Sequence, residues 1–384
     1  MTLPLEGLLV LDFSTLLPGP LATFMLAEAG AEVIKVERPG GEDLRRFPPH
    51  VGSTSAAFAA LNGGKRSLCL DLKTEEGRAA LRPLIGRADI LVEQFRPGTM
   101  ERLGLGYEQA RTINPRLIYC SVTGYGQTGP RAGEAGHDIN YQAVTGLLSL
   151  SPGSADAPAT PPALVADIAG GAMPAVLNIL LALRRRDLTG EGAHLDIAMA
   201  DAMFTFAWFA LAEGHATGRL PGAGDQMLAG GSPRYGLYAT RDRQFLAVGA
   251  LEDKFWAAFC DGIGLRPEQR DPAADPRRAR EAVAAIIRER DGAVWRDLLE
   301  PLDCCCTLVA SLEEARRDPH FIGRGLFART ALDGAGRSLP AVSVPIAPVL
   351  RRPPDEPRRV PDVGGTTGGI GEEVELASNP RPDG

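Results

Sequence analysis

The first part of the chain alternates short apolar runs with segments that carry helical signals. The apolar runs are typical of buried strands and lie at residues 7–13, 33–37, 67–72, 90–93 and 117–122. Helices are expected between them, for example at 21–29 and 75–87. Pro20 can open the first helix and Gly30 can end it. Strands that alternate with helices form parallel β-α-β units, so the pattern predicts a parallel sheet covered by helices.

A different pattern follows. Two apolar helices are expected at 168–183 and 198–213, and a glycine-rich stretch comes after them. Residues 235–239 and 245–250 then flank a polar turn, which is a hairpin signal. Three more helices are expected at 253–263, 276–290 and 293–299. A hairpin followed by helices favours a smaller α+β domain.

These patterns together predict an α/β fold with two domains. We expect a large Rossmann-like domain with a parallel sheet at 1–213 and a small α+β domain at 235–325. Linkers are expected at 214–234 and 326–339. The tail at 340–384 is rich in proline and glycine, and we expect it to wrap back and complete the large domain.

Composition excludes several classes of function. The net charge is −7, whereas binding to nucleic acid needs a surplus of Lys and Arg, so no nucleic-acid partner is expected. The apolar stretch at 163–183 contains Asp167 and Pro174, which argues for a buried helix and against a membrane partner. No secretory signal opens the chain, and the six cysteines, three of them at Cys304–Cys306, are interpreted as reduced thiols. A cytoplasmic location follows from this interpretation.

Two common cofactor motifs are incomplete in this sequence. Residues 124–129 fit the G-x-G-x-x-G pattern, but Pro130 follows where a dinucleotide site would need a helix to open. Lys65 follows a glycine but lacks the other residues of a P-loop. The five histidines show no zinc-ligand spacing, so no metal is expected.

Longer stretches resemble a known family. SVTGYGQTGP at 121–130 and AGHDINY at 135–141 are similar to the signature of α-methylacyl-CoA racemases, a branch of the family III CoA-transferase superfamily. Further similar stretches, from the first strand to the second domain, are LPGPLATFMLAEAGAEVIKVERPGG, KRSLCLDLK, EQFRPGTMERLGLG, LVADIAGGAM, GGSPRYGLY and VGALEDKF. The resemblance implies an interlocked homodimer with the fold of that superfamily.

The resemblance assigns catalytic roles to His137, Asp167 and Glu252. Racemisation at the carbon beside a thioester needs a base on one face and a proton donor on the other, and His137 and Asp167 are expected to fill these roles. Glu252 is expected to pair with the histidine across the dimer interface; the alternative is that it only caps the next helix. Asp167 lies where a helix begins, so the dipole would lower its pKa and burial would raise it. Backbone N–H groups from Ile168 onwards are candidates for holding the enolate oxygen.

Coenzyme A is expected only as part of the substrate, and no separate cofactor is implied. Because coenzyme A is an anion, its binding requires a local cluster of positive charge, and Lys65 and Arg66 are among the candidates for that cluster. The residues that we expect to contact the acyl-CoA, most of them through the resemblance, are Arg38, Leu72, Lys73, Arg96, Arg102, Gly136, Asp138 and Tyr141. Asp138 is also expected to support its loop. Met203, Phe204, Trp208 and Met227 are candidates for an acyl pocket, although such residues are more often core.

Two other functions are consistent with the same residues. In a CoA-transferase, Asp167 would be a nucleophile that forms an anhydride and then a thioester with CoA. A protein that binds CoA esters without turnover is the third possibility. The presence of both His137 and Asp167 favours the racemase, which would move one proton at the α-carbon of a 2-methylacyl-CoA thioester.

Overall fold

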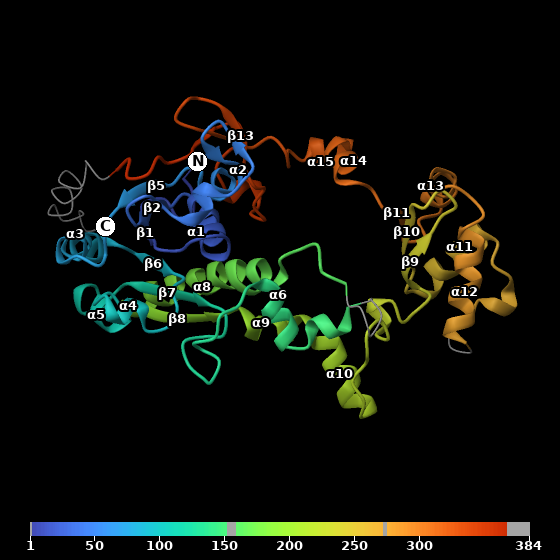
Figure 1. Cartoon of the computed structure of the whole chain (residues 1–384). Helices are drawn as coiled ribbons and strands as arrows, with labels where there is room; N and C mark the ends of the chain where they lie inside the picture. The colour runs from blue at the N-terminus through green and yellow to red at the C-terminus, as the bar shows by residue number, and fades with distance from the viewer. Residues whose placement is uncertain (1, 152–158, 272–274, 367–384) are drawn as a thin grey trace. The chain divides into compact units, whose positions relative to one another are not determined.

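Six parallel strands form the main sheet of the computed structural model, which describes residues 2–151, 159–271 and 275–366 (Figure 1). The sheet has the order β5-β2-β1-β6-β7-β8, and every neighbouring pair is parallel. Its strands are β1 (Leu9–Asp12), β2 (Glu32–Glu37), β5 (Arg66–Cys69), β6 (Ile90–Glu93), β7 (Ile118–Thr123) and β8 (Ala193–Ala198). The predicted parallel sheet is therefore confirmed, with β8 as a strand that the sequence did not indicate.

The chain divides into two compact units. The first comprises Met1–Gln142, Ala163–Met203 and Pro319–Gly384, and the second comprises Ala143–Pro162 and Phe204–Asp318. The sequence-based domain boundaries, at 213, 235, 325 and 340, remain a prediction. Of the tail that they assign to the large domain, residues 367–384 lie outside the described part of the chain.

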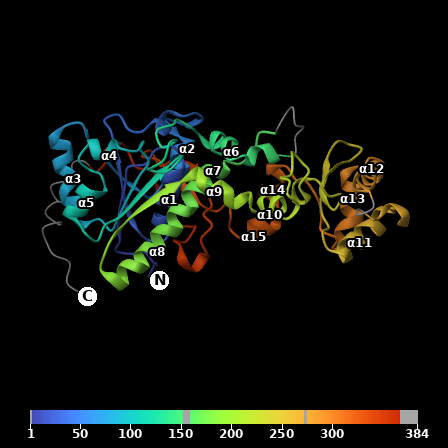
Figure 2. The same ribbon diagram turned by 90° about the horizontal axis from the view of Figure 1, so that it is seen from below.

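Helices cover both faces of the parallel sheet, because its central strands are apolar on both sides. One face packs against α3 (Glu75–Arg87) and α5 (Tyr107–Ile113), with Leu11, Leu84 and Tyr119 in the shared core. The other face lies against α1 (Pro18–Glu28) and α8 (Met173–Thr189), which also contact each other. Figure 2 shows the strands between these two pairs of helices.

The long apolar helix begins earlier and ends later than expected. It starts as α7 (Val165–Asp167), widens into a π-turn at Ile168–Ala172 and continues as α8 to Thr189. The whole stretch is long and apolar enough to cross a membrane on length and composition alone. Core helices of soluble proteins have the same properties, and α8 packs on β7 and β8 of the sheet.

Several shorter elements complete the first unit. Around the parallel sheet these are α2 (Ala56–Asn62), α4 (Thr99–Arg102) and the hairpin of β3 (His50–Val51) and β4 (Thr54–Ser55). Two elements run on into the second unit, namely α6 (Asp138–Val144) and α9 (Met199–Phe206). The helix expected at 198–213 is in fact two helices, α9 and α10 (Trp208–Thr217), because the backbone at Ala207 leaves the helical conformation.

The carboxy-terminal segment returns to the first unit through α15 (Pro319–Gly323). It adds a small sheet of β12 (Thr330–Leu332), β13 (Ser338–Pro340) and β14 (Arg358–Arg359). The Gly64 N–H donates to the carbonyl oxygen of Arg359 at 2.8 Å, which fixes the segment beside α2.

A buried carboxylate ties this segment to the first helix. Glu28, at the end of α1, is 1% exposed and forms ion pairs with Arg358, at 2.7 Å between Nε and Oε1, and with Arg329. The two arginines are buried as well. Because one buried carboxylate pairs with two buried guanidinium groups, its charge is needed for the segment to dock.

The second unit contains a three-stranded sheet of β9 (Tyr235–Ala239), β10 (Phe245–Gly249) and β11 (Cys306–Leu308), all antiparallel, so the expected hairpin is present. Its other helices are α11 (Asp253–Ile263), α12 (Pro276–Ile287), α13 (Gly292–Leu299) and α14 (Leu312–Arg317). The core contains Trp256, Phe259 and Trp295, and the Trp295 indole donates to the carbonyl oxygen of Ile287 at 2.7 Å.

Replacing the buried carboxylate should destabilise the fold strongly. We expect Glu28→Gln to lower the free energy of unfolding by about 3–5 kcal/mol, because Arg329 and Arg358 would stay buried without the buried carboxylate that they share. The matched control is Glu32→Gln, which breaks an exposed ion pair with Arg66 at 2.6 Å and should cost about 1 kcal/mol or less. Urea unfolding measures both values. Equal losses for the two variants would contradict this role of Glu28.

Candidate active site

A cavity of about 400 Å³ opens in the first unit where β6 and β7 end. Binding sites of parallel sheets lie at this edge, outside the carboxyl ends of the strands. The cavity is lined by residues from the loop after β6, the end of β7, the loop before α6, α7 and the turn after β1. These are Gln94, Phe95, Arg96, Pro97, Val122, Thr123, Gly124, Ala132, Glu134, Ala135, Gly136, His137, Asn140, Tyr141, Asp167, Leu16, Pro18 and Met199.

His137 stands directly before α6 and is held there through its backbone. Its N–H donates to Oδ1 of Asn140 at 3.0 Å, and its carbonyl oxygen accepts the N–H of Asn140 at 2.8 Å. The Tyr141 hydroxyl donates to the carbonyl oxygen of Gly136 at 2.6 Å. A Cβ on Gly136 would lie 2.7 Å from the Tyr141 ring, so only glycine fits. These contacts leave the imidazole exposed at the cavity.

Asp138 joins the His137 loop to the helix that carries Asp167. Its Oδ1 accepts the backbone N–H groups of Ala166, at 2.6 Å, and Asp167, at 3.0 Å, and its Oδ2 accepts the side-chain amide of Gln142 at 2.6 Å. The carboxylate is buried. Both carboxylate oxygens are therefore bound within the chain. This geometry makes Asp138 a structural support for His137, its neighbour in the chain, and for Asp167.

The first N–H groups of the Asp167 helix are all occupied. Those of Ala166 and Asp167 donate to Asp138, and that of Ile168 donates to the carbonyl oxygen of Leu164 at 3.0 Å. The expectation that N–H groups from Ile168 onwards hold an enolate oxygen is therefore wrong at the first of these groups. The helix begins at Val165, so Ile168 already lies inside its first turn.

Asp167 is half-buried, and its surroundings disfavour the charged form. Burial, and next the negative charge of Asp138, raise the pKa of Asp167 to about 6, while His137 acts in the opposite direction. The pKa is therefore shifted in the direction that the sequence associates with burial. A carboxyl group with this pKa exchanges protons near neutral pH, as acid–base catalysis requires.

The π-turn after Asp167 packs closely against the cavity wall. A Cβ on Gly170 would lie 2.8 Å from the carbonyl oxygen of Met199, and one on Gly171 would lie 3.0 Å from Cβ of Pro18. Both glycines therefore permit an approach that a side chain would block. Widened turns of this kind are frequent at functional sites.

A buried acid shapes the loop that carries Arg96. Glu93, the last residue of β6, accepts the N–H of Phe95 at 2.8 Å. Burial raises the pKa of Glu93 to about 7. The side-chain oxygen of Gln94, the next residue, accepts the N–H of Gly19 at 3.0 Å and so connects this loop to the first turn of α1.

The structure brings together some of the residues expected to bind acyl-CoA. Arg96, Gly136 and Tyr141 line the cavity with His137 and Asp167. The other expected residues lie outside its lining. Of these, Arg38 follows β2 and binds Asp43 at 2.5 Å, Leu72 and Lys73 follow the neighbouring strand β5, and Arg102 ends α4.

Lys65 is enclosed and does not reach a ligand. Its ammonium group lies within 3.0 Å of Asp12, Thr23, Asn62 and the carbonyl oxygen of Pro20, and the side chain is fully buried. The interpretation of Lys65 as a phosphate contact is therefore wrong, and burial is the reason. Arg66, weighed with it, pairs with Glu32 at the surface.

Glu252 belongs to the second unit, at the N-cap position of α11. Its side chain is exposed and makes no capping hydrogen bond, so the purely structural alternative has no support. Its expected pairing with His137 stays a prediction. Across the described ranges of the chain, no three His, Cys, Asp or Glu side chains gather as a metal site would require.

Several lining residues had no sequence signal. Leu16 lies in the turn after β1 and Pro18 begins α1, and no residue pattern indicated that either faces a cavity. Met199 follows the unpredicted strand β8. Gln94 could have been found, because it follows a predicted strand directly. Of the four candidates for an acyl pocket, none lines the cavity.

Known proteins are similar to this chain over most of its length. The model of CoA-transferase family III matches residues 5–367. The chain is 37% identical to alpha-methylacyl-CoA racemase of Homo sapiens over 91% of this chain and 90% of the relative. It is 34% identical to acetyl-CoA:oxalate CoA-transferase of Acetobacter aceti, over 85% of this chain and 86% of the relative.

A solved structure shares the fold. A CAIB/BAIF family protein from Brucella suis superposes with a TM-score of 0.82 at 30% identity, over 97% of this chain and all of that one. The fold expected from the resemblance is thereby confirmed. With the family model matched along nearly the whole chain, the protein belongs to CoA-transferase family III and is an enzyme of that superfamily.

Proposed function

We propose that the protein racemises or epimerises 2-methylacyl-CoA thioesters by moving a proton at the α-carbon. The observation that carries the proposal is that an imidazole, His137, and a carboxyl group with a pKa of about 6, Asp167, line one cavity. An imidazole and a carboxyl group of raised pKa are two different acid–base groups, and such a pair suits proton removal on one face and proton return on the other. Its similarity to two alpha-methylacyl-CoA racemases supports the choice of reaction.

The proton transfer balances without a cofactor. In one direction the Asp167 carboxylate takes the α-hydrogen and the electron pair of the C–H bond moves into the thioester as an enolate. The His137 imidazolium then gives its proton to the other face of the same carbon. In the reverse direction the two groups exchange roles. After each turnover, one group gives its extra proton to solvent and the other takes a proton from solvent, so both return to their starting states.

The rest of the ligand would supply binding energy. Arg96 lines the cavity, and Arg38, Leu72 and Lys73 follow β2 and β5 at the carboxyl edge of the sheet. We assign these four residues, together with Arg102 at the end of α4, to the CoA moiety. Contacts far from the reacting carbon hold it in place between the two groups. Coenzyme A thus enters only with the substrate.

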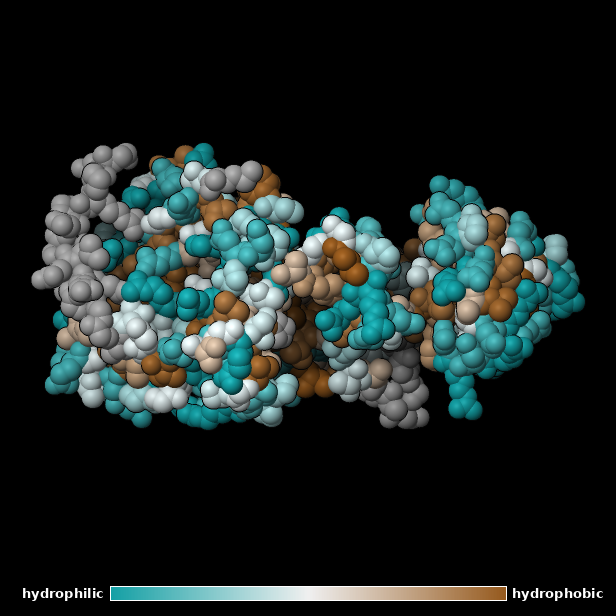
Figure 3. Space-filling model, turned by 90° about the horizontal axis from the view of Figure 1, so that it is seen from above, coloured by the Kyte–Doolittle hydropathy of each residue, from teal (hydrophilic) through white to brown (hydrophobic). Residues whose placement is uncertain are grey.

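We further propose a homodimer in the cytoplasm, with no nucleic-acid or membrane partner. Helix α8 leaves Leu177, Leu181 and Leu188 exposed, at 58%, 60% and 70%, which is unusual for one side of a soluble helix. Hydrophobic residues also reach the surface on the face drawn in Figure 3. A second copy that covers such residues could bring its own Glu252 to His137, which would stabilise the imidazolium.

The second candidate is a CoA-transferase, favoured by the 34% identity to an acetyl-CoA:oxalate CoA-transferase. There the Asp167 carboxylate would attack the thioester carbonyl and release the CoA thiolate, leaving a mixed anhydride. The thiolate would then attack the Asp167 carbonyl and free the first acid, and a second acid would take the CoA. In this reaction the α-hydrogen stays in place.

Exchange of the α-hydrogen separates the two functions. The enzyme, incubated in D2O with one pure enantiomer of 2-methylacyl-CoA and no acceptor acid, should incorporate deuterium and lose optical purity. His137→Ala and Asp167→Ala should each reduce the rate by about 100-fold or more, because each removes one proton-transfer group. Mass spectrometry and chiral chromatography follow the reaction. Transfer of CoA to a free acid without exchange would contradict the racemase.

The pH dependence should report the ionisation of Asp167. In the direction in which Asp167 is the base, kcat/KM should rise with pH through about 6, because the carboxylate is the active form. Asp138→Asn should shift this acidic limb to lower pH, since the negative charge of Asp138 raises the pKa of Asp167. The asparagine oxygen can still accept the two backbone N–H groups. An unshifted limb in a folded variant would exclude Asp167 as its source.

The oligomeric state can be measured directly. Light scattering should give twice the chain mass of 40.7 kDa. Leu181→Glu should weaken the dimer, because it would bury a charge in the interface. Asp187→Lys changes a charge on the same helix and is the control. A monomeric wild type would contradict the proposed assembly.

A further inference from the structure

Leu16 adopts a backbone conformation that leucine rarely takes. It lies in the turn between β1 and α1, with φ of +63°. In this left-handed region the Cβ atom crowds the backbone, so residues other than glycine, asparagine and aspartate avoid it. Such residues persist only where their surroundings fix them, and they gather at functional sites.

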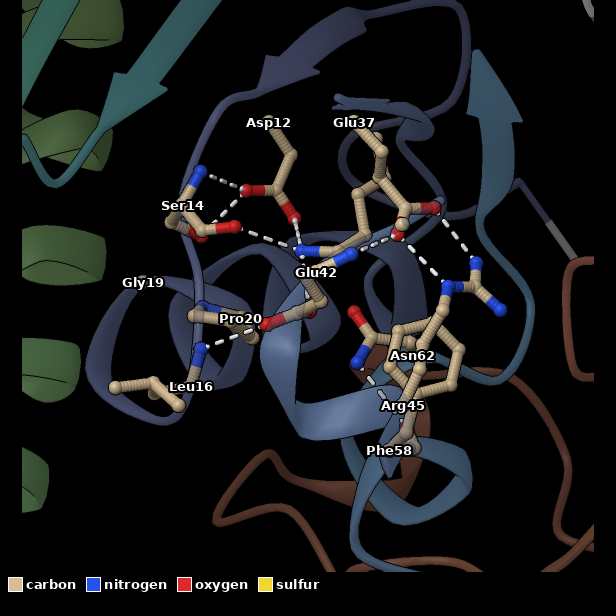
Figure 4. A network of polar contacts seen from close by, with 12 residues as sticks. Asp12, Ser14, Leu16, Gly19, Pro20, Glu37, Glu42, Arg45, Phe58 and Asn62 are labelled. Atoms are coloured by element: carbon tan, nitrogen blue, oxygen red, sulfur yellow. Dashed lines mark hydrogen bonds and ion pairs between the residues drawn. The ribbon is translucent and has the colours of Figure 1, made fainter. Parts of the chain in front are cut away.

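A buried carboxylate fixes Leu16. Its N–H donates to Oε2 of Glu42 at 2.8 Å, and Oε1 of Glu42 pairs with the ammonium group of Lys35, also at 2.8 Å. Glu42 and Lys35 are both buried. The Leu16 nitrogen faces the carboxylate, and its side chain extends away from the network (Figure 4).

The same network holds the two ends of the turn. Lys35 donates to the carbonyl oxygen of Ser14 at 2.8 Å, and the Ser14 N–H donates to Asp12 at 2.9 Å. Lys65 binds Asp12 at 3.0 Å and donates to the carbonyl oxygen of Pro20 at 2.9 Å. The buried charges of Asp12, Lys35, Glu42 and Lys65, two of each sign, therefore all bind backbone groups of residues 14–20.

This turn forms the cavity wall next to the Asp167 helix. Leu16 and Pro18 both line the cavity, and Pro18 packs against Gly171 in the π-turn that follows Asp167. Leu17, between them, is half-buried and does not line the cavity. Because Leu16 lines the cavity and its backbone is held by the charge network, the network determines the shape of this wall.

We propose that Leu16 is a specificity-determining residue that contacts the substituents on the α-carbon, and that Glu42 positions it there. This inference rests on the proposed proton transfer at that carbon. The substrate class that it selects is a thioester with a small apolar α-substituent, such as methyl. A larger branch would meet a wall that cannot move, because the network holds its backbone.

Truncation of the side chain should change selectivity for the α-substituent. The assay measures deuterium incorporation from D2O into 2-methylhexanoyl-CoA and 2-ethylhexanoyl-CoA, which differ by one methylene. A methylene in an apolar pocket changes kcat/KM by about 10–200-fold. Leu16→Ala should therefore raise the ratio of kcat/KM for the ethyl over the methyl substrate at least about 10-fold, and Leu16→Phe should lower it.

Three further variants separate selectivity from folding. Leu17→Ala, the matched control, should leave the ratio unchanged. Glu42→Gln keeps an acceptor for the Leu16 N–H but loses the ion pair with Lys35, and should shift the ratio in the same direction as Leu16→Ala. Leu16→Gly suits the left-handed backbone, so it should shift the ratio without lowering Tm, and it replaces Leu16→Ala if that variant does not fold.

The outcomes distinguish this inference from the function on which it rests. If the wild type exchanges the α-hydrogen and the ratio is unchanged in Leu16→Ala and Leu16→Gly, Leu16 does not select the substituent and the inference fails alone. If the wild type does not exchange the α-hydrogen of any acyl-CoA, the proposed function is wrong, and the inference that rests on it is wrong as well. A shift in Leu17→Ala equal to that in Leu16→Ala would also overturn it.

Discussion

One carboxylate holds the site together. Asp138 follows His137 in the chain and accepts the backbone N–H groups of Ala166 and Asp167, so it fixes the loop of one proposed proton-transfer group to the helix of the other. The same charge lies close enough to Asp167 to raise its pKa. Placement and acidity of the Asp167 carboxyl group therefore have a common origin, and a residue whose carboxylate oxygens are both bound within the chain sets both.

A second buried network has a comparable role on the other wall. Charges are expensive to bury unless they are paired, and here two lysines and two carboxylates are paired around the turn after β1. That turn carries Leu16 in a strained conformation and packs against the π-turn after Asp167. The cavity thus has two walls whose backbones are fixed by buried charge rather than by apolar packing alone.

Periodicity in the sequence predicted the regular elements well. The bounds expected for α3, β6 and α11 agree with the structure, because their apolar spacing is strong; in addition, Thr74 caps the start of α3 and Gly264 ends α11. Strand β8 was missed, since it lies at the sheet edge and its sequence AHLDIA alternates with polar residues. The family resemblance, not periodicity, singled out His137 and Asp167. The conformation of Leu16 depends on a carboxylate 26 residues away, which local patterns do not reveal.

The central claim is that an imidazole and a carboxyl group flank one acidified carbon. A crystal structure of the enzyme with a bound 2-methylacyl-CoA tests it most directly. The account predicts that the α-carbon lies about 3–3.5 Å from a ring nitrogen of His137 on one face and from a carboxyl oxygen of Asp167 on the other. A complex in which both groups lie on the same face, or in which only Asp167 reaches the thioester, would contradict it.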